Sequence, residues 1–145
     1  MILFSLLRFC FSHTAKLSVC DRYTGATRGL AGIDTPGAET VTILTRGICK
    51  VPLDAYGPIG QGLSAFLMGR SSSTIQGINI HLGLIDSDYM GQLQAIVSVS
   101  EPPVVIQKGT CIAQLVPFMS CVPTVVDQSH GTGGFGSTGP PQNNY

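Results

Sequence analysis

The sequence predicts an all-β domain, and three observations lead to that prediction. Val, Ile and Thr are prominent, 18 Gly and 9 Pro residues supply frequent turns, and no window holds apolar residues at sustained helical spacing. A hydrophobic fraction of 43% with only 11% charged residues is typical of an ordered chain. The length of 145 residues suits one domain with a real core. The simplest architecture that accounts for these features is a mostly antiparallel β sandwich or barrel.

The expected strands are short apolar runs that turn residues separate. Val41–Leu44 and Gly47–Val51 indicate a strand pair or one bent strand, and Leu93–Val99 alternates Leu, Ile and Val with Gln and Ser. Lys108-Gly109 predicts a turn between the last two runs. Prolines such as Pro52 mark run ends, where strands tolerate them. The other expected strands are Leu63–Met68, Ile75–Ile80, Val104–Ile106 and Cys111–Val116.

The two ends of the chain differ from this β region. Met1–Phe11 resembles the start of a signal peptide, although Arg8 interrupts it, no clear cleavage site follows, and it is too short to span a bilayer. We therefore expect residues 1–27 to be a leader or a polyprotein-derived segment. Residues 28–126 would form the β domain, and residues 127–145 a glycine-rich arm that stays flexible until a ligand orders it.

Charge limits the kinds of partner that the chain suits, and the cysteine content bears on its metal binding and its compartment. Lys+Arg and Asp+Glu number 8 each, so net charge favours neither nucleic acid nor a membrane as partner. The 5 cysteines cannot all pair within one chain, and no spacing completes a zinc site. Reduced thiols in an intracellular protein are the favoured interpretation, with secretion a lesser alternative that the N-terminal segment leaves open.

An acidic loop, GIDTPGAETVTI, resembles the active-site loop of a retroviral aspartic protease. That enzyme would need Gly directly after Thr35, because the backbone there hydrogen-bonds across the dimer. Pro36 stands in that place and has no N–H donor. No glycine-rich flap pattern follows at a suitable distance, so Asp34 is not a protease aspartate.

Two further motifs carry groups suited to phosphate or sugar chemistry. In LMGRSS, Arg70 with Ser71 and Ser72 offers donors for phosphate oxygens, although a solvated turn would look the same. In GLIDSDYMGQ, a strand end would hold Asp86 where a carboxylate can orient and deprotonate water. The ring of Tyr89 could lie against a planar or sugar ring. An ordinary Asp-rich hairpin turn is the alternative.

The last two motifs lie towards the C-terminus. Gln114 is the one polar side chain inside the apolar run of GTCIAQLV, and a buried amide needs partners from the protein or from a ligand. In GTGGFGSTG, Gly131–Gly139, backbone N–H groups could wrap an anion, with hydroxyls from Ser137 and Thr138 and a stacking face from Phe135. This segment lacks the Lys and the following helix of a P-loop, and a flexible linker is the alternative.

In this order and spacing, AGID, GRSS, GLIDSDYMGQ, GTCIAQLV and GTGGFGSTG resemble the five motifs of the trimeric dUTPase family. The resemblance runs from about Arg28 to Gly139, and the GRSS form is similar to the dUTPase domains of betaretrovirus-like elements, exogenous or endogenous. It implies a dUTPase-like jelly roll or distorted β-barrel with a flexible C-terminal arm. It also implies a homotrimer that hydrolyses dUTP to dUMP and pyrophosphate with Mg²⁺.

The resemblance implies roles for individual residues as well. Asp86 would activate the attacking water, Gln114 would help to place it, and Asp34 would reach the metal through water. Hairpin backbone near Gly77–Leu82 would select uracil, and Tyr89 would pack on deoxyribose. The implied substrate contacts are Arg70, Ser71, Ser72, Gly83, Tyr89, His130, Phe135, Gly136, Ser137 and Thr138.

Two positions depart from the family pattern. Cys111 replaces the Arg that usually opens Arg-Ile-Ala-Gln, and His130 replaces the Arg that usually precedes the last motif. Two alternatives stand beside an active dUTPase, and these two positions motivate the first of them. One is a weakened or inactive relic of an endogenous retroviral polyprotein that serves as a binding or structural module. The other is a fragment of a dUTPase–protease polyprotein whose protease is not in this chain.

Overall fold

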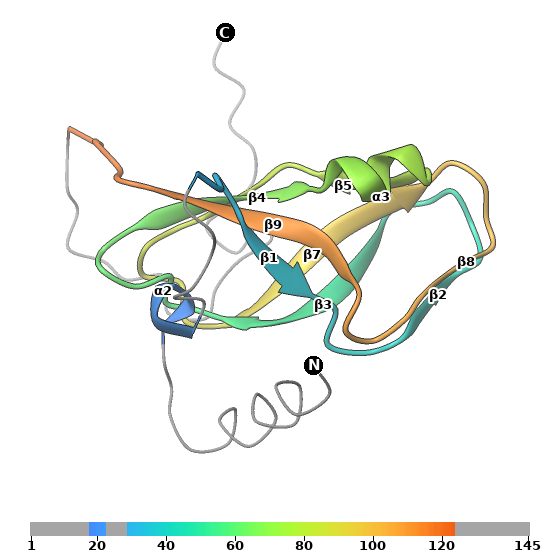
Figure 1. The fold of residues 1–145 in the computed structure, drawn as a ribbon, viewed down its shortest axis with the longest axis horizontal. Helices are drawn as coiled ribbons and strands as arrows, with labels where there is room; N and C mark the ends of the chain where they lie inside the picture. The colour runs from blue at the N-terminus through green and yellow to red at the C-terminus, as the bar shows by residue number, and fades with distance from the viewer. Residues whose placement is uncertain (1–17, 23–28, 124–145) are drawn as a thin grey trace, which may run out of the picture.

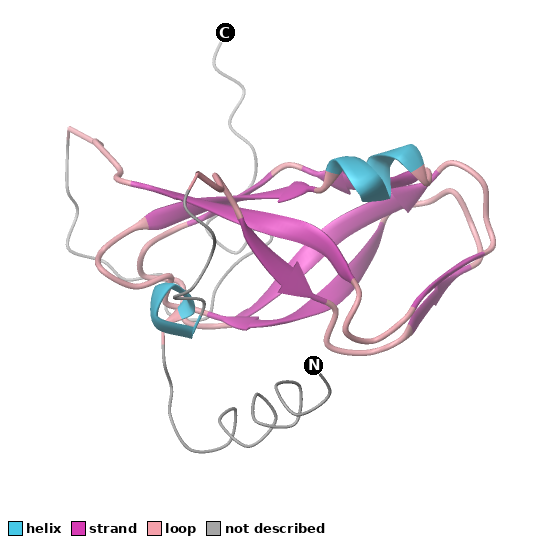
Figure 2. Ribbon diagram, in the orientation of Figure 1, coloured by secondary structure: helices cyan, strands magenta, loops and turns pink. Residues whose placement is uncertain are grey.

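The computed structural model describes residues 18–22 and 29–123, which form two antiparallel sheets and a two-stranded ribbon (Figures 1 and 2). The first sheet has the order β1-β9-β4-β6 and the second the order β3-β7-β5. In the first sheet the strands are β1 (Ile33–Pro36), β9 (Cys111–Phe118), β4 (Ser64–Gly69) and β6 (Gly83–Ile85). The second contains β3 (Cys49–Tyr56), β7 (Gln92–Val99) and β5 (Ile78–His81), and the ribbon pairs β2 (Val41–Ile43) with β8 (Val104–Ile106). The predicted all-β fold is confirmed.

The core lies between the facing sides of the two sheets. Side chains alternate strictly between buried and half-buried along β7, as expected for a strand with one face on a core. Leu53, Val97 and Leu115 are fully buried there. Each such side chain contributes about 1.5–3 kcal/mol through burial.

In the residues that the structure describes, two short helices accompany the sheets. The helix α2 (Val19–Arg22) begins where Val19 and Cys20 donate backbone hydrogen bonds to Pro58 and Ile59, and Val19 is only 1% exposed. Part of the segment before residue 28 therefore belongs to the core. In the described part of the chain, neither helix is long and apolar enough to cross a membrane.

The second helix, α3 (Ser71–Ile75), corrects the expectation of a strand over Ile75–Ile80. Ile75 ends the helix, Gly77 follows with a φ of 80°, and β5 begins only at Ile78. A positive φ costs glycine little, so this position lets the chain reverse. A helix of 5 residues is too short to show an apolar period, which is why the sequence did not reveal it.

The pairing of the early strands also differs from expectation. The runs around β2 and β3 do not pair with each other, because β2 pairs with β8 and β3 with β7. Pro52 lies inside β3, beside a shift in the β3–β7 register, and not at a strand end. β1 was not predicted as a strand, and its ladder with β9 shifts at Pro36, which lacks an N–H donor. The predicted turn at Lys108-Gly109 is confirmed, with a φ of 85° at Gly109.

Candidate active site

Arg70 is the centre of a polar cluster at one end of the first sheet. It follows β4 directly, and its backbone N–H donates to Ile112 at 3.2 Å, which extends the β4–β9 ladder by one residue. Its guanidinium donates from Nη1 to the backbone oxygen of Cys111 at 2.9 Å, and its Nε lies 3.0 Å from Oδ1 of Asp34. The side chains of Arg70 and Asp34 are 37% and 49% exposed. An ion pair this accessible can exchange partners with an incoming anion.

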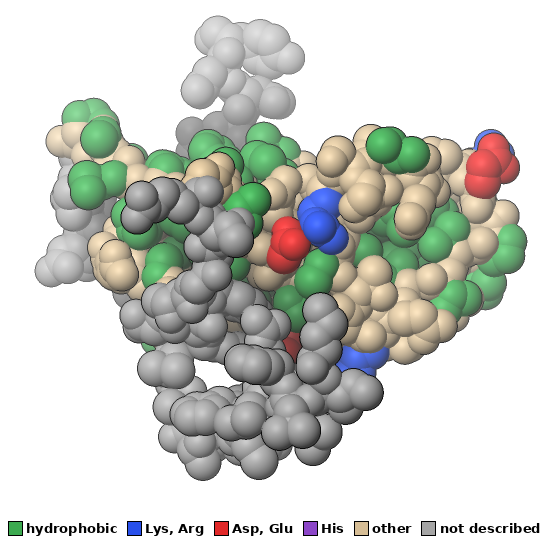
Figure 3. All heavy atoms as spheres, viewed as in Figure 1, with side chains coloured by type: hydrophobic (Ala, Val, Ile, Leu, Met, Phe, Trp, Pro, Cys, Tyr) green, Lys and Arg blue, Asp and Glu red, His purple; other side chains and the backbone are tan. Residues whose placement is uncertain are grey.

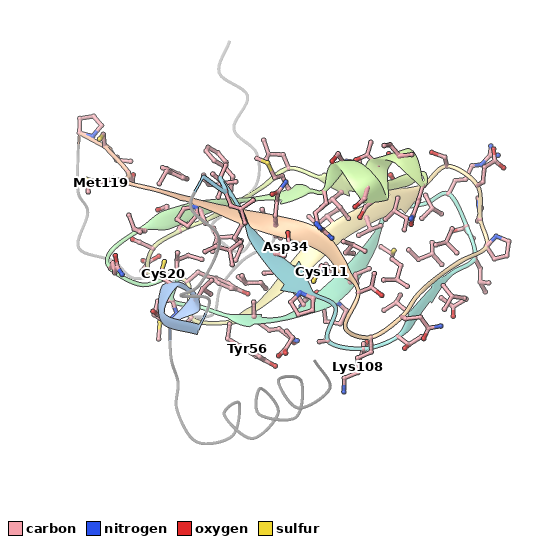
Figure 4. The ribbon with its side chains drawn as sticks, viewed as in Figure 1. Cys20, Asp34, Tyr56, Lys108, Cys111 and Met119 are labelled. Carbon is pink, nitrogen blue, oxygen red and sulfur yellow. The ribbon has the colours of Figure 1, made fainter. Side chains whose placement is uncertain are left out.

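The strands place these groups together although they are far apart in sequence. Asp34 of β1 lies opposite Gln114 of β9, which in turn lies opposite Met68 of β4. Figure 4 shows Asp34 and Cys111 close together on the β1–β9 side of the molecule. In Figure 3 one acidic and one basic group touch near the middle of this face, which otherwise carries few charges.

The Gln114 amide has a hydrogen-bond partner on one side and a glycine on the other. Its Nε2 donates to the backbone oxygen of Gly69 at 3.1 Å, so the partner of this half-buried amide nitrogen comes from the protein. Gly32 lies against Oε1, where a Cβ would clash severely. The absence of a side chain at Gly32 therefore leaves the space that Oε1 occupies. The sequence did not single out Gly32, although its place two residues before Asp34 in AGID was the available signal.

Ser71 and Ser72 stand at the start of α3 beside Arg70, and both are exposed. The carbonyl of Arg70 accepts hydrogen bonds from the backbone N–H groups of Ser73 and Thr74. The predicted Gly-led turn of Arg and hydroxyls is thus the entry into a short helix. Asp34, Arg70, Ser71, Ser72 and Gln114 all lie at this end of the first sheet.

Asp86 and Tyr89 lie at the opposite end of β4, whereas Gly83 lies beside Leu67 within the strand. The β4–β6 register pairs Leu67 with Gly83 and Ala65 with Ile85, so Asp86 falls level with Ser64. From Ser64 to Arg70 the chain advances six positions, or about 20 Å at a strand rise of ~3.3 Å per residue. Asp86 does follow a strand end, as predicted. Within one protomer, however, the structure does not bring it to Arg70.

Tyr89 is fixed within its loop. Its backbone N–H donates to the oxygen of Asp86 at 3.1 Å, and its hydroxyl donates to the backbone oxygen of Gln92 at 2.9 Å. The ring is partly buried against the core. Gln92 was not among the predicted residues, although its place at the end of GLIDSDYMGQ was visible. The predicted residues His130, Phe135, Gly136, Ser137 and Thr138 lie outside the described residues.

The described residues contain no group of three or more His, Cys, Asp or Glu that could hold a metal. Mg²⁺ favours oxygen ligands, keeps several waters, and is commonly bound by one or two carboxylates together with substrate phosphates. The single, half-exposed carboxylate of Asp34 fits a site of this kind, in which substrate phosphates supply most of the ligands. The four cysteines that the structure describes are not in disulfides, and burial raises the pKa of the Cys49 thiol above its ordinary value.

Comparisons with known proteins agree with this architecture. The dUTPase family model matches residues 20–139. The Gag-Pro polyprotein of sheep pulmonary adenomatosis virus is 39% identical over 117 residues, which cover 78% of this chain and 13% of that polyprotein. The human endogenous retrovirus group K member 9 Pol protein is 37% identical over 93 residues, or 63% of this chain and 8% of that protein. This chain therefore spans only a small part of these relatives.

Solved structures share the fold. The crystal structure of dUTPase from Streptococcus mutans has a TM-score of 0.62 at 25% identity and covers 69% of this chain and 86% of that one. The native EIAV dUTPase has a TM-score of 0.56 at 23% identity and covers 70% of this chain and 89% of that one. The jelly roll expected from the sequence is thus confirmed by its structural neighbours.

Proposed function

Because the chain belongs to the dUTPase family, we propose that it hydrolyses dUTP to dUMP and pyrophosphate. One observation carries the proposal: Asp34, Arg70 and Gln114, from three separate motifs, meet at one end of the first sheet. A guanidinium with half-exposed donors suits the oxygens of a phosphate chain. A fixed amide beside it suits the placing of a water.

The proposed reaction is an in-line attack of water on the α-phosphorus. Asp86 orients this water and accepts its proton, and Gln114 helps to place it. Arg70 and Ser71 stabilise the charge that develops on the phosphate oxygens, together with Ser137 and Thr138. Mg²⁺, held mainly by the triphosphate, would supply further charge neutralisation, and Asp34 would hold it through water.

A homotrimer is part of the proposal because one protomer cannot complete the site. Asp86 and Arg70 lie about 20 Å apart along β4, whereas a general base must be within one water of the reacting group. A neighbouring copy has to supply one of them. The outer face of the first sheet offers an apolar contact surface, where the rings of Phe66 and Phe118 stack at 4.6 Å and Leu84 is 60% exposed.

The alternative of a module that binds without turnover stems from Cys111 and His130. Pyrophosphate release by purified protein with dUTP and Mg²⁺ distinguishes the two. We expect steady release from dUTP, much slower release from UTP, and none from Asp86→Asn with dUTP. Binding of dUTP without any release would favour the module. Light scattering that shows only monomer at micromolar protein would contradict both the trimer and the shared site.

A further inference from the structure

We propose that Gln92 is a positioning residue for sugar selection, because it locks the loop of Asp86 and Tyr89 onto β3. The side chain of Gln92 holds β3, and its backbone carbonyl holds the hydroxyl of Tyr89. The inference rests on the proposed function in one respect, namely that Tyr89 meets the sugar of dUTP. The anchoring itself follows from the contacts below.

The anchor lies where the β3–β7 ladder changes register. Pro52 pairs with Gln94 and Tyr56 with Gln92, so residues 53–55 of β3 stand opposite Leu93 alone. Inside this gap, Nε2 of Gln92 donates to the backbone oxygen of Leu53 at 3.1 Å. Leu53 is fully buried, so its carbonyl needs a donor from the protein. The side-chain amide of Gln92 supplies a hydrogen bond where the regular ladder is interrupted.

The same residue fixes the ring of Tyr89. The phenol donates to the oxygen of Gln92 at 2.9 Å, which sets the direction of the ring. Gly91 lies against the ring, and a Cβ there would come within 2.9 Å of Cζ of Tyr89. The hydroxyl of Tyr89 and the amide of Gln92 thus join the ring to β3 through one residue.

The backbone of the loop is seated on the connection between β3 and β4. The N–H of Gly57 donates to the oxygen of Gly91 at 2.9 Å. A side chain at Gly57 would collide with the carbonyl of Tyr89, so only glycine allows the two backbones to come this close. The loop is therefore attached at two points, by the hydrogen bond between Gly57 and Gly91 and by the hydrogen bond from the Gln92 amide to Leu53.

A fixed ring can select the sugar only while it stays in place. Steric exclusion of a ribose 2′-OH requires that Tyr89 cannot move aside when the larger sugar enters. Loss of the Gln92 amide removes the bond to Leu53 while the phenol still follows the Gln92 carbonyl. The ring and the Gln92 backbone can then shift together. We expect UTP to gain more from this freedom than dUTP does.

The test compares Gln92→Met, which keeps side-chain length and loses the amide, with Gln94→Met as matched control. Gln94 lies on the same strand and face and pairs with Pro52 at the other edge of the register gap. Hydrogen exchange of residues 86–92 is measured on the full chain without nucleotide. Then kcat/KM is measured for dUTP and UTP. We expect about tenfold faster exchange and a roughly tenfold smaller dUTP/UTP ratio in Gln92→Met only, mainly through KM for UTP.

Each outcome decides a separate step. Unchanged exchange in Gln92→Met overturns the anchoring. Faster exchange with an unchanged dUTP/UTP ratio overturns the role in sugar selection. If the parent does not turn over dUTP, the proposed function fails while the exchange result still decides the anchoring. Tyr89→Phe removes the hydrogen bond between the ring and the Gln92 carbonyl and keeps the bond from Gln92 to Leu53. It therefore tests the inference even if Gln92→Met does not fold. An unaltered dUTP/UTP ratio in Tyr89→Phe also contradicts it.

Discussion

Two variants that are each inactive should restore activity when they share a trimer. Asp86→Asn removes the proposed base at one end of β4. Arg70→Ala removes the residue proposed to bind phosphate at the other end. The two positions lie about 20 Å apart within one protomer. If each active site takes Arg70 from one protomer and Asp86 from a neighbour, a mixed trimer contains sites in which both residues are intact.

The size of the recovery follows from random assembly. In an equal mixture, a site is intact only when the protomer that supplies Arg70 is the Asp86→Asn variant and its neighbour is the Arg70→Ala variant. Each condition holds for half of the protomers, so about one quarter of all sites are complete in a cyclic trimer. If both residues came from the same protomer, no site in any mixed trimer would be intact.

The assay is pyrophosphate release after the two variants are unfolded together and refolded. Each variant refolded alone, and the two mixed without unfolding, are the controls and should stay at background. We expect roughly one quarter of the parental rate at equal protein and saturating dUTP. A refolded mixture that is trimeric by light scattering and still inactive would refute the shared site.

Four further predictions concern single changes. Asp86→Asn should abolish turnover and leave dUTP affinity within a few-fold in calorimetry, because a general base acts mainly in the transition state. Truncation after Val126 should remove activity and keep the melting temperature, because the core that the structure describes is built from residues before it; a truncated protein with full activity would contradict the role of the last motif. His130→Arg should raise kcat/KM about tenfold to a hundredfold and flatten its pH profile, since histidine ordinarily titrates near ~6.5 and arginine stays charged. The raised pKa of Cys49 means that the folded state keeps the thiol proton to higher pH than the unfolded state does. The free energy of unfolding should therefore fall as pH rises above 9.0, and it should fall less in Cys49→Ala than in the parent.

Strands with a strong pattern were predictable, and their partners were not. Leu93–Val99 alternates apolar and polar residues, and it became β7 almost residue for residue. β1 has only four residues with an Asp and a Pro among them, so no alternation marks it. Its existence depends on the edge that β9 offers, which is a contact over some 80 residues. Local sequence carries no information of that kind.

The candidate site was predictable as a set of residues, and its division was not. The motifs named Asp34, Arg70, Gln114 and Asp86, but nothing in their spacing tells which end of a strand each one occupies. The division follows from register: β4 carries Arg70 beyond its last residue and pairs its first residues with the strand before Asp86. Gln92 was missed for a related reason, because the register gap that its amide fills appears only after β3 and β7 have paired.

The hydrogen bond of Arg70 to β9 does not depend on the side chain at position 111. Arg70 contacts residue 111 through the backbone oxygen, at 2.9 Å, and any residue in β9 would present that oxygen. Its second partner, Asp34, is held by the pairing of β1 with β9, which likewise does not depend on the side chain at 111. The loss of one cation at this position therefore leaves the placement of Arg70 intact. In the described part of this cluster, Arg70 is the cation beside Asp34. Substitution of Arg70 should therefore lower activity more in this protein than in a relative with arginine at both positions.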